Sequence, residues 1–233
     1  MPNKPLLEFP PLHEGILIKR YKRFLADVKL DNDEIVTAHC PNTGPMTGLV
    51  YEGGRVRLRY CPSISRKLDW TWEQSLVPNL EKGSSCWVGV NTLLANKLVR
   101  LAIENNYLKD ELGEILGIRQ EVVYGADRKS RIDFLLTSNN IKSNGKFIYL
   151  EVKNTTWVEK NVALFPDTVT TRGQKHLKEL MGVMPDSKAV LVPCITRPDI
   201  TEFAPGDNAD PKYGDLFRQA IAAGLVVIPC SFN

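Results

Sequence analysis

The sequence lacks the features of several protein classes. Its five cysteines are odd in number, widely spaced and contain no Cys-x-x-Cys pair, which disfavours a disulfide scaffold and a zinc ribbon. Residues 1–5 contain no apolar signal region. The longest nearly uncharged stretch, residues 219–233, is interrupted by Pro229, and its apolar part is shorter than the about 18 residues of a spanning helix. We therefore expect a cytoplasmic protein without a membrane partner.

Motifs of common enzyme and regulator classes are also missing. The chain has no Gly-x-Ser-x-Gly elbow, no Gly-x-x-x-x-Gly-Lys-Ser/Thr loop and no Gly-x-Gly-x-x-Gly after a strand. A compact helix pair with a basic second helix, as a helix-turn-helix regulator needs, is not found either. Hydrolase triads, P-loop enzymes, dinucleotide enzymes and helix-turn-helix regulators are therefore disfavoured.

The basic residues are concentrated in the first third of the chain. The 233 residues, 43% hydrophobic and 24% charged, are typical of a globular protein with one large domain or two small ones. The net charge of +3 is too small to identify a partner. However, residues 15–26 and 53–68 are two windows without acids, and together they hold Lys19, Arg20, Lys22, Arg23, Arg55, Arg57, Arg59, Arg66 and Lys67.

Residues 1–82 have the pattern of a small β domain. Short stretches rich in Val, Ile, Tyr and Arg alternate with turn clusters, and residues 55–60 alternate strictly between arginine and apolar side chains. One strand face then belongs to the core and the other is cationic. We interpret the domain as an OB-like β-barrel that binds nucleic acid by neutralising phosphates and stacking bases. An ordinary solvated strand face is the alternative.

Residues 83–233 contain helices and strands in a specific order. The periodicities predict a helix over 91–108 and strands over 118–124, 131–137 and 147–154. A capping box, Thr171-Arg172-Gly173-Gln174, opens the next helix. A strand over 188–194, a helix over 213–223 and a strand over 225–228 follow. This order predicts an α/β domain with a central mixed sheet.

Three residues on neighbouring predicted strands could support catalysis. The alternation places Asp133 opposite an apolar face, and it places Glu151 and Lys153 together on one face of the next strand. Two carboxylates can bind Mg²⁺ or Mn²⁺, and a lysine can stabilise charge on a scissile phosphate. Glu104, on the leucine stripe of its helix, is a third candidate ligand, and Glu121 is its rival. A solvated Glu-x-Lys pair is the alternative.

The element order resembles the PD-(D/E)XK, or restriction-endonuclease-like, nuclease fold, in which Asp133, Glu151 and Lys153 match the acid, acid and lysine of the motif. A wider resemblance, to the sugar fermentation stimulation protein A (SfsA) family, rests on four segments. These are Cys-Pro-Asn-Thr-Gly-Pro-Met at 40–46, Ser-Arg-Ile-Asp-Phe-Leu-Leu at 130–136, Tyr-Leu-Glu-Val-Lys-Asn at 149–154 and Phe-Pro-Asp-Thr-Val-Thr-Thr-Arg-Gly-Gln-Lys-His at 165–176.

The resemblance to SfsA proteins implies an OB-like barrel joined to a nuclease-like domain, DNA binding without marked sequence preference, and a proposed regulatory link to sugar (maltose) metabolism. It does not decide catalysis. We therefore expect a DNA-binding protein with a divalent-metal-dependent phosphodiesterase site, and the alternative is a non-catalytic DNA-binding regulator with a nuclease fold as scaffold. A sugar sensor with a pocket of Trp70, Trp72 and Trp157 is a weaker third hypothesis. A homodimer is compatible with the sequence.

The segment after the third predicted strand adds a phosphate-binding hypothesis. Arg172 has Lys175 and His176 as its i+3 and i+4 neighbours, so the three share one face of the first helical turns. Free N–H groups at a helix start also favour an anion. We expect Arg172, Lys175 and His176 to contact DNA phosphates. A solvated helix start is the alternative.

Overall fold

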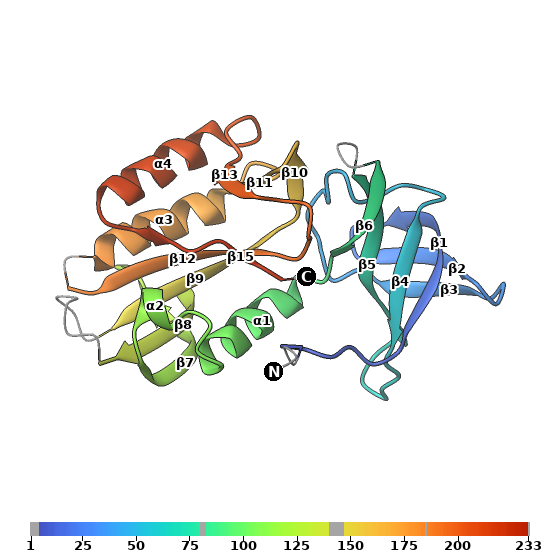
Figure 1. Cartoon of the computed structure of the whole chain (residues 1–233), viewed down its shortest axis with the longest axis horizontal. Helices are drawn as coiled ribbons and strands as arrows, with labels where there is room; N and C mark the ends of the chain where they lie inside the picture. The colour runs from blue at the N-terminus through green and yellow to red at the C-terminus, as the bar shows by residue number, and fades with distance from the viewer. Residues whose placement is uncertain (1–4, 80–82, 140–146, 185, 233) are drawn as a thin grey trace.

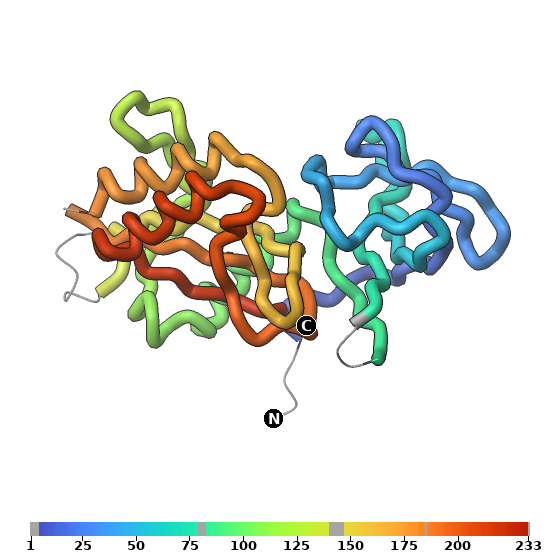
Figure 2. The backbone as a smooth tube through the Cα atoms, turned by 90° about the horizontal axis from the view of Figure 1, so that it is seen from above, coloured from blue at the N-terminus to red at the C-terminus, as the bar shows by residue number. Residues whose placement is uncertain are grey.

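The computed structural model describes residues 5–79, 83–139, 147–184 and 186–232. They form a β-barrel and a larger α/β domain, which lie side by side in both Figure 1 and Figure 2. The predicted fold class, an OB domain followed by an α/β domain with a mixed sheet, is confirmed. Within the described residues, no helix is long and apolar enough to cross a membrane.

Six strands form the barrel, with the sheet order β3-β2-β1-β4-β5-β6. A parallel pairing between β3 and β5 closes the sheet on itself. Val56 and Leu58 point inward, as the alternation predicts, and pack around the fully buried Trp72. The strands are β1 (Leu12–Tyr21), β2 (Leu25–Leu30), β3 (Ile35–His39), β4 (Arg55–Tyr60), β5 (Trp70–Asn79) and β6 (Ser84–Gly89).

The barrel extends beyond the sequence-based boundary at 82/83. Strand β6 pairs antiparallel with β5 along its whole length and therefore belongs to the barrel sheet. The second domain begins after Val90, which is buried in the barrel core, and the neighbouring Gly89 N–H donates to the Thr196 carbonyl at 2.9 Å. The periodicity after residue 80 predicted the change of domain, but the last barrel strand has too little alternation to be seen.

The second domain is built on a mixed sheet with the order β14-β12-β9-β8-β7, to which β15 adds beside β12. The pairs β7–β8 and β8–β9 are antiparallel, whereas β9 and β12 are parallel. The strands are β7 (Ile115–Tyr124), β8 (Ser130–Ser138), β9 (Ile148–Thr155), β12 (Lys188–Ile195), β14 (Val226–Val227) and β15 (Cys230–Ser231). A second, three-stranded sheet contains β10 (Trp157–Glu159), β11 (Val162–Phe165) and β13 (Glu202–Pro205), which were not predicted.

Helices cover both faces of the mixed sheet. Helix α1 (Leu93–Glu104) packs on one face, and α3 (Thr171–Val183) and α4 (Pro211–Ala222) pack together on the other (Figure 1). The predicted helix over 91–108 ends early, at Glu104, and Asn106 takes a left-handed φ of 61° before the short α2 (Lys109–Leu112). The cap of α3 is Thr170 rather than Thr171, since the Thr170 hydroxyl accepts the Gly173 N–H.

Candidate metal centre and nucleic-acid interface

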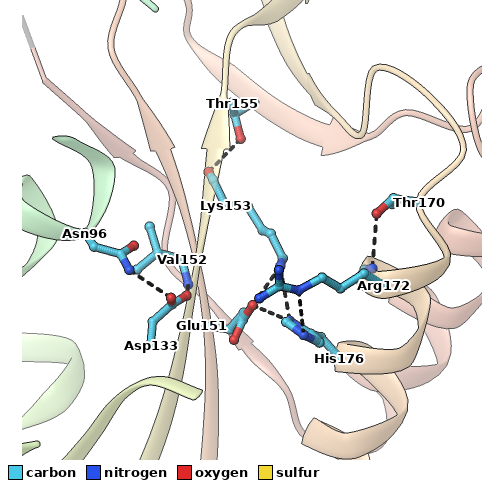
Figure 3. Close-up of polar contacts among 10 residues, drawn as sticks. Asn96, Asp133, Glu151, Val152, Lys153, Thr155, Thr170, Arg172 and His176 are labelled. Carbon is cyan, nitrogen blue, oxygen red and sulfur yellow. Dashed lines mark hydrogen bonds and ion pairs between the residues drawn. The ribbon is translucent and has the colours of Figure 1, made fainter. Parts of the chain in front are cut away.

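Asp133 lies where β8 separates from β9. The β8–β9 pairing stops at Phe134, and the Asp133 carboxylate instead accepts the Val152 N–H at 2.7 Å. Its other oxygen accepts from the Asn96 side chain on α1 at 2.8 Å (Figure 3). The carboxylate thus replaces a ladder hydrogen bond at the opening between the two strands.

The backbone around Asp133 departs from regular alternation. Ile132 packs with the α3 and α4 cluster, whereas Phe134 packs with the α1 cluster, so the single apolar face that alternation predicts opposite Asp133 is not formed. The β7–β8 ladder omits the Glu121–Asp133 pair, and Glu121 has a φ of 52°. This irregularity turns the strand at the residue that bears the candidate ligand.

Glu151 projects from β9 toward α3 and is almost completely buried. Its Oε1 atom accepts from the Lys153 ammonium at 2.7 Å and from His176 Nδ1. The Oε2 atom is also buried and has no hydrogen-bond partner in the described part of the chain. A buried, unpartnered carboxylate oxygen costs free energy, which binding of a cation would recover.

His176 and Arg172 support this carboxylate from α3. Arg172 Nε donates to His176 Nε2 at 3.4 Å, so the hydrogen-bond pattern places the proton of a neutral imidazole on Nδ1, facing Glu151. His176 is buried, with 3% of its surface exposed. The prediction that His176 contacts phosphate directly is therefore wrong; it contacts Glu151 and Lys153 instead, because it lies on the inner face of α3.

The two carboxylates differ in their affinity for protons. Burial and the neighbouring Glu151 charge raise the pKa of Asp133 from 3.8 to about 6, although Val152 and Asn96 donate to it. Burial would also raise the pKa of Glu151, but the Lys153 ammonium and the His176 hydrogen bond keep this pKa below its ordinary value. Glu151 is thus held ionised, whereas the neighbouring Asp133 has a raised pKa.

This donor set fits a hard divalent cation. Glu151 offers one free oxygen, and each oxygen of Asp133 accepts a single hydrogen bond and keeps a second lone pair. The described residues contain no group of three or more His, Cys, Asp or Glu side chains placed to hold a metal. Two carboxylates suit Mg²⁺ or Mn²⁺, because such ions keep several waters and use substrate phosphates as further ligands.

Glu104 does not join this site. It is exposed, and its carboxylate pairs with Arg100 at 2.8 Å on the outer face of α1. The buried face of the helix consists of Ala95, Leu98, Val99, Ala102 and Ile103, so it includes Leu98 of the predicted leucine stripe but not Glu104. Asn96, which sequence reasoning missed, approaches Asp133 from the first turn, about 12 Å along the axis from Glu104. The prediction of Glu104 as a ligand is wrong, and its rival Glu121 is also exposed.

The strand arginines of the barrel are paired with acids. Arg55 bonds to Glu14 and Asp31 at 2.6 Å, and Arg57 bonds to Glu14 at 2.8 Å. Arg59 bonds to the buried Glu73 at 2.7 Å. Three acids thus balance three bases, so the prediction of a free cationic face is wrong. The acidic partners of these arginines lie on other strands or in turns, so the alternation within one strand does not reveal them.

The basic residues between positions 15 and 26 have different contacts. Arg20 donates to the backbone carbonyls of Asn42 and Gly44, so it supports a loop. Lys19 pairs with Asp27 at 3.6 Å. Lys22 and Arg23 are exposed in a turn with positive φ, and no acid pairs with either within the described ranges. This turn is the part of the window that remains available for phosphate.

On α3, Arg172 is exposed and lies above the buried His176, which leaves its guanidinium edge open to an anion. Lys175 pairs with Asp127 at 3.1 Å and with Glu179 at 3.6 Å. The predicted shared cationic face is therefore reduced to Arg172, because its two neighbours have other partners.

The three tryptophans of the sugar-sensor hypothesis do not form one pocket. Trp72 lies in the barrel core, and Trp70 packs against His13 and Tyr60 on the barrel surface. Trp157 lines a separate cavity between the barrel and the second domain. The predicted aromatic pocket is absent from the described structure, since the residues lie on different elements and face different ways.

Comparisons with known proteins match both domains. Residues 18–90 match the family model described as the SfsA N-terminal OB domain. Residues 93–233 match the model described as the sugar fermentation stimulation protein RE domain. The chain belongs to the SfsA family. The junction of the two matches, at residues 90–93, agrees with the end of β6 at Gly89.

Similar SfsA proteins cover nearly the whole chain. A sugar fermentation stimulation protein homolog of Prochlorococcus marinus (strain MIT 9313) is 64% identical over 100% of this chain and 92% of its own length. One of Parasynechococcus marenigrum (strain WH8102) is 63% identical over 100% of this chain and 91% of its own. The structure of Pyrococcus furiosus SfsA in complex with Ca²⁺ superposes with a TM-score of 0.84 at 26% identity, covering 98% of this chain and 92% of that one.

Proposed function

We propose that this SfsA protein binds DNA with little sequence preference and cleaves its phosphodiester bonds at a site that uses Mg²⁺ or Mn²⁺. The observation that carries the proposal is the buried, unpartnered Oε2 of Glu151, whose carboxylate pairs with Lys153 and lies close enough to Asp133 for its charge to raise the pKa of that residue. The similar Pyrococcus furiosus SfsA forms a complex with Ca²⁺, which supports a site for a hard cation, because Ca²⁺ and Mg²⁺ share a preference for oxygen ligands.

Asp133 and Glu151 would hold the ion, and the protein orients both groups. Val152 and Asn96 fix Asp133, and His176 fixes Glu151. When bound, the ion supplies Lewis acidity and lowers the pKa of a water. Lys153, with 13% of its side chain exposed, can place its ammonium against the phosphate and stabilise the charge that develops there.

A variant series tests the chemistry. We expect Glu151→Gln to lose Mn²⁺ binding and DNA cleavage, because its amide cannot supply the free anionic oxygen. Lys153→Met should keep Mn²⁺ binding at pH 8 and lose turnover, since the ammonium acts on transition-state charge. Glu104→Gln is the matched control and should behave like the wild type. Calorimetry with Mn²⁺ and cleavage of plasmid and single-stranded DNA measure the two properties. Unchanged cleavage by Glu151→Gln would refute the assignment.

A non-catalytic DNA-binding regulator is the second candidate. Its support is that the described residues offer two carboxylates and no third metal-ligating side chain at the site. Absence of cleavage by the wild type on every DNA form, with Mn²⁺ binding retained, would favour this candidate. A role in stimulating sugar fermentation, which the name of the relatives suggests, is compatible with either candidate.

DNA binding itself is expected to depend on the unpaired bases. Replacing Lys22 and Arg23 by Ala should flatten the slope of log K against log salt by about 1.5, because each lost phosphate contact removes about 0.7 to 0.9. Arg55 and Arg57 are the matched pair, and replacing both by Ala should change the slope little, since acids already neutralise them. Filter binding at several salt concentrations measures both. A larger effect of the second pair would contradict the reasoning.

A further inference from the structure

A cavity of about 250 Å³ lies between the barrel and the α/β domain, next to Lys153. One wall is the barrel loop with Asn42 and Gly44. The opposite wall consists of β9 and the segments that follow it. Its residues include Lys153, Asn154, Thr156, Trp157, Phe165 and Asp167. The cavity therefore connects the OB domain directly to the proposed phosphodiesterase site.

The barrel loop that forms this wall is held in place from both domains. Arg20 donates to the carbonyls of Asn42 and Gly44 at 2.8 and 2.9 Å. Asn42 Oδ1 accepts the Gly44 N–H at 2.9 Å, and the Thr92 hydroxyl donates to the Pro41 carbonyl at 2.6 Å. The wall is thus preorganised, which lowers the entropic cost of binding a ligand against it.

The chemistry of the cavity suits a single nucleotide. Lys153 supplies a cation for a phosphate, and its ammonium lies 5.9 Å from the Phe165 ring centroid. Trp157 offers an aromatic surface for a base. Asn42, Asn154 and Asp167 offer hydrogen-bonding groups for the edge of a base, although the Asp167 carboxylate also accepts from the backbone of Met46 and Thr47. Asp167 would repel a phosphate and accept a base N–H, which orients the phosphate toward Lys153.

We propose that this cavity takes one unpaired nucleotide, with its phosphate at Lys153 and its base between Trp157 and the barrel loop. The inference rests on the proposed function and names its substrate class as single-stranded or locally unpaired DNA. The position of the aromatic surface decides this. A base can reach Trp157 inside the cavity of about 250 Å³ only when it is unpaired and taken out of the stack, and the bases of an intact duplex are not.

Filling the cavity tests the proposal. An added Cβ on Gly44 lies 3.2 Å from Asn42 Oδ1 and 3.9 Å from Asp167 Oδ1, both in the cavity wall, so Gly44→Leu should occupy it. Gly182→Leu on α3, where an added Cβ meets nothing within 4 Å, is the matched control. Trp157→Ala is the second variant, which enlarges the cavity and removes the aromatic surface. Far-UV circular dichroism verifies that each variant is folded.

Binding of thymidine 5′-monophosphate is measured by calorimetry in EDTA, so that it is independent of metal chemistry. We expect Gly44→Leu and Trp157→Ala each to weaken binding by about tenfold or more, because the first fills the cavity and the second removes the surface on which the base stacks. Gly182→Leu should match the wild type. No binding by the wild type, or equal binding by wild type and Gly44→Leu, would overturn the proposal.

Cleavage in Mg²⁺ separates this inference from the proposed function. The wild type and Gly182→Leu should cleave a single-stranded hexathymidylate at least about tenfold faster than a fully paired hairpin, and Gly44→Leu should lose that activity. Nucleotide binding without cleavage would refute the phosphodiesterase and keep the nucleotide site. Cleavage that is equal for both DNA forms and unaffected by Gly44→Leu would refute the nucleotide site and keep the phosphodiesterase.

Discussion

Replacing Asp133 by Asn should stabilise the α/β domain, and only above about pH 5. Burial and the Glu151 charge raise the pKa of Asp133 from 3.8 to about 6. A carboxyl whose pKa is higher in the folded protein binds its proton more tightly there than in the unfolded chain. The wild type therefore loses stability as the pH rises from about 4 to 6, and the loss is complete above pH 6.

The magnitude follows from that pKa difference. Since each pKa unit corresponds to about 1.4 kcal/mol, ionised Asp133 destabilises the folded protein by about 3 kcal/mol. An Asn carries no charge and keeps the shape. Its oxygen can accept the Val152 N–H, and its amide can donate to Asn96 if that side chain flips. Imperfect replacement of the neutral carboxyl by an amide costs about 1 kcal/mol, which leaves a gain of about 2 kcal/mol.

Urea unfolding at pH 4.5 and pH 8 measures this effect. Circular dichroism at 222 nm reports on the α/β domain, because the helices of the described structure all lie there. EDTA in the buffer keeps divalent ions from the two carboxylates. We expect Asp133→Asn to be about 2 kcal/mol more stable than the wild type at pH 8, with little advantage at pH 4.5. A variant that is less stable at pH 8, or equally changed at both, would refute the reasoning.

Asp199→Asn is the control with the opposite sign. Burial would raise the pKa of Asp199, but the hydrogen bonds and the charge of Arg197 lower it. Both Asp199 oxygens accept from Arg197 at 2.7 Å, and both side chains are buried. A lowered pKa stabilises the folded state above the ordinary pKa, so the variant should lose about 3 kcal/mol at pH 8 and less at low pH.

Two further substitutions test the packing of the barrel and the domain junction. Arg59→Met should lower the free energy of unfolding of the barrel by about 3 kcal/mol, because it leaves the Glu73 carboxylate buried without its cation. Unfolding in urea, followed by tryptophan fluorescence, measures this loss. Adding Glu73→Gln should restore most of it. Gly89→Ala should lower the free energy of unfolding by about 1–3 kcal/mol, because the added Cβ would lie 2.7 Å from Thr196 Oγ1 across the domain junction. Adding Thr196→Gly in the same chain should restore the lost stability. An unchanged thermal unfolding temperature for Gly89→Ala would contradict the described junction.

Much of the fold could be predicted from the sequence, because backbone periodicity is local. Strict alternation at residues 55–60 gave the correct inner face of β4, and the apolar runs around Asp133 and Glu151 gave two neighbouring strands. The order of elements gave the α/β domain with its mixed sheet. Each of these patterns depends only on which side chains a strand or helix buries.

Tertiary structure decided what lies opposite each face, since local periodicity shows where a side chain points and not what it meets. The three strand arginines meet acids brought from distant positions, and Glu104 lies outside the buried face of α1, where it pairs with Arg100. His176 reaches Glu151 only because α3 folds back over β9. The cavity beside Lys153 needs walls from both domains, so it exists only once the barrel has docked.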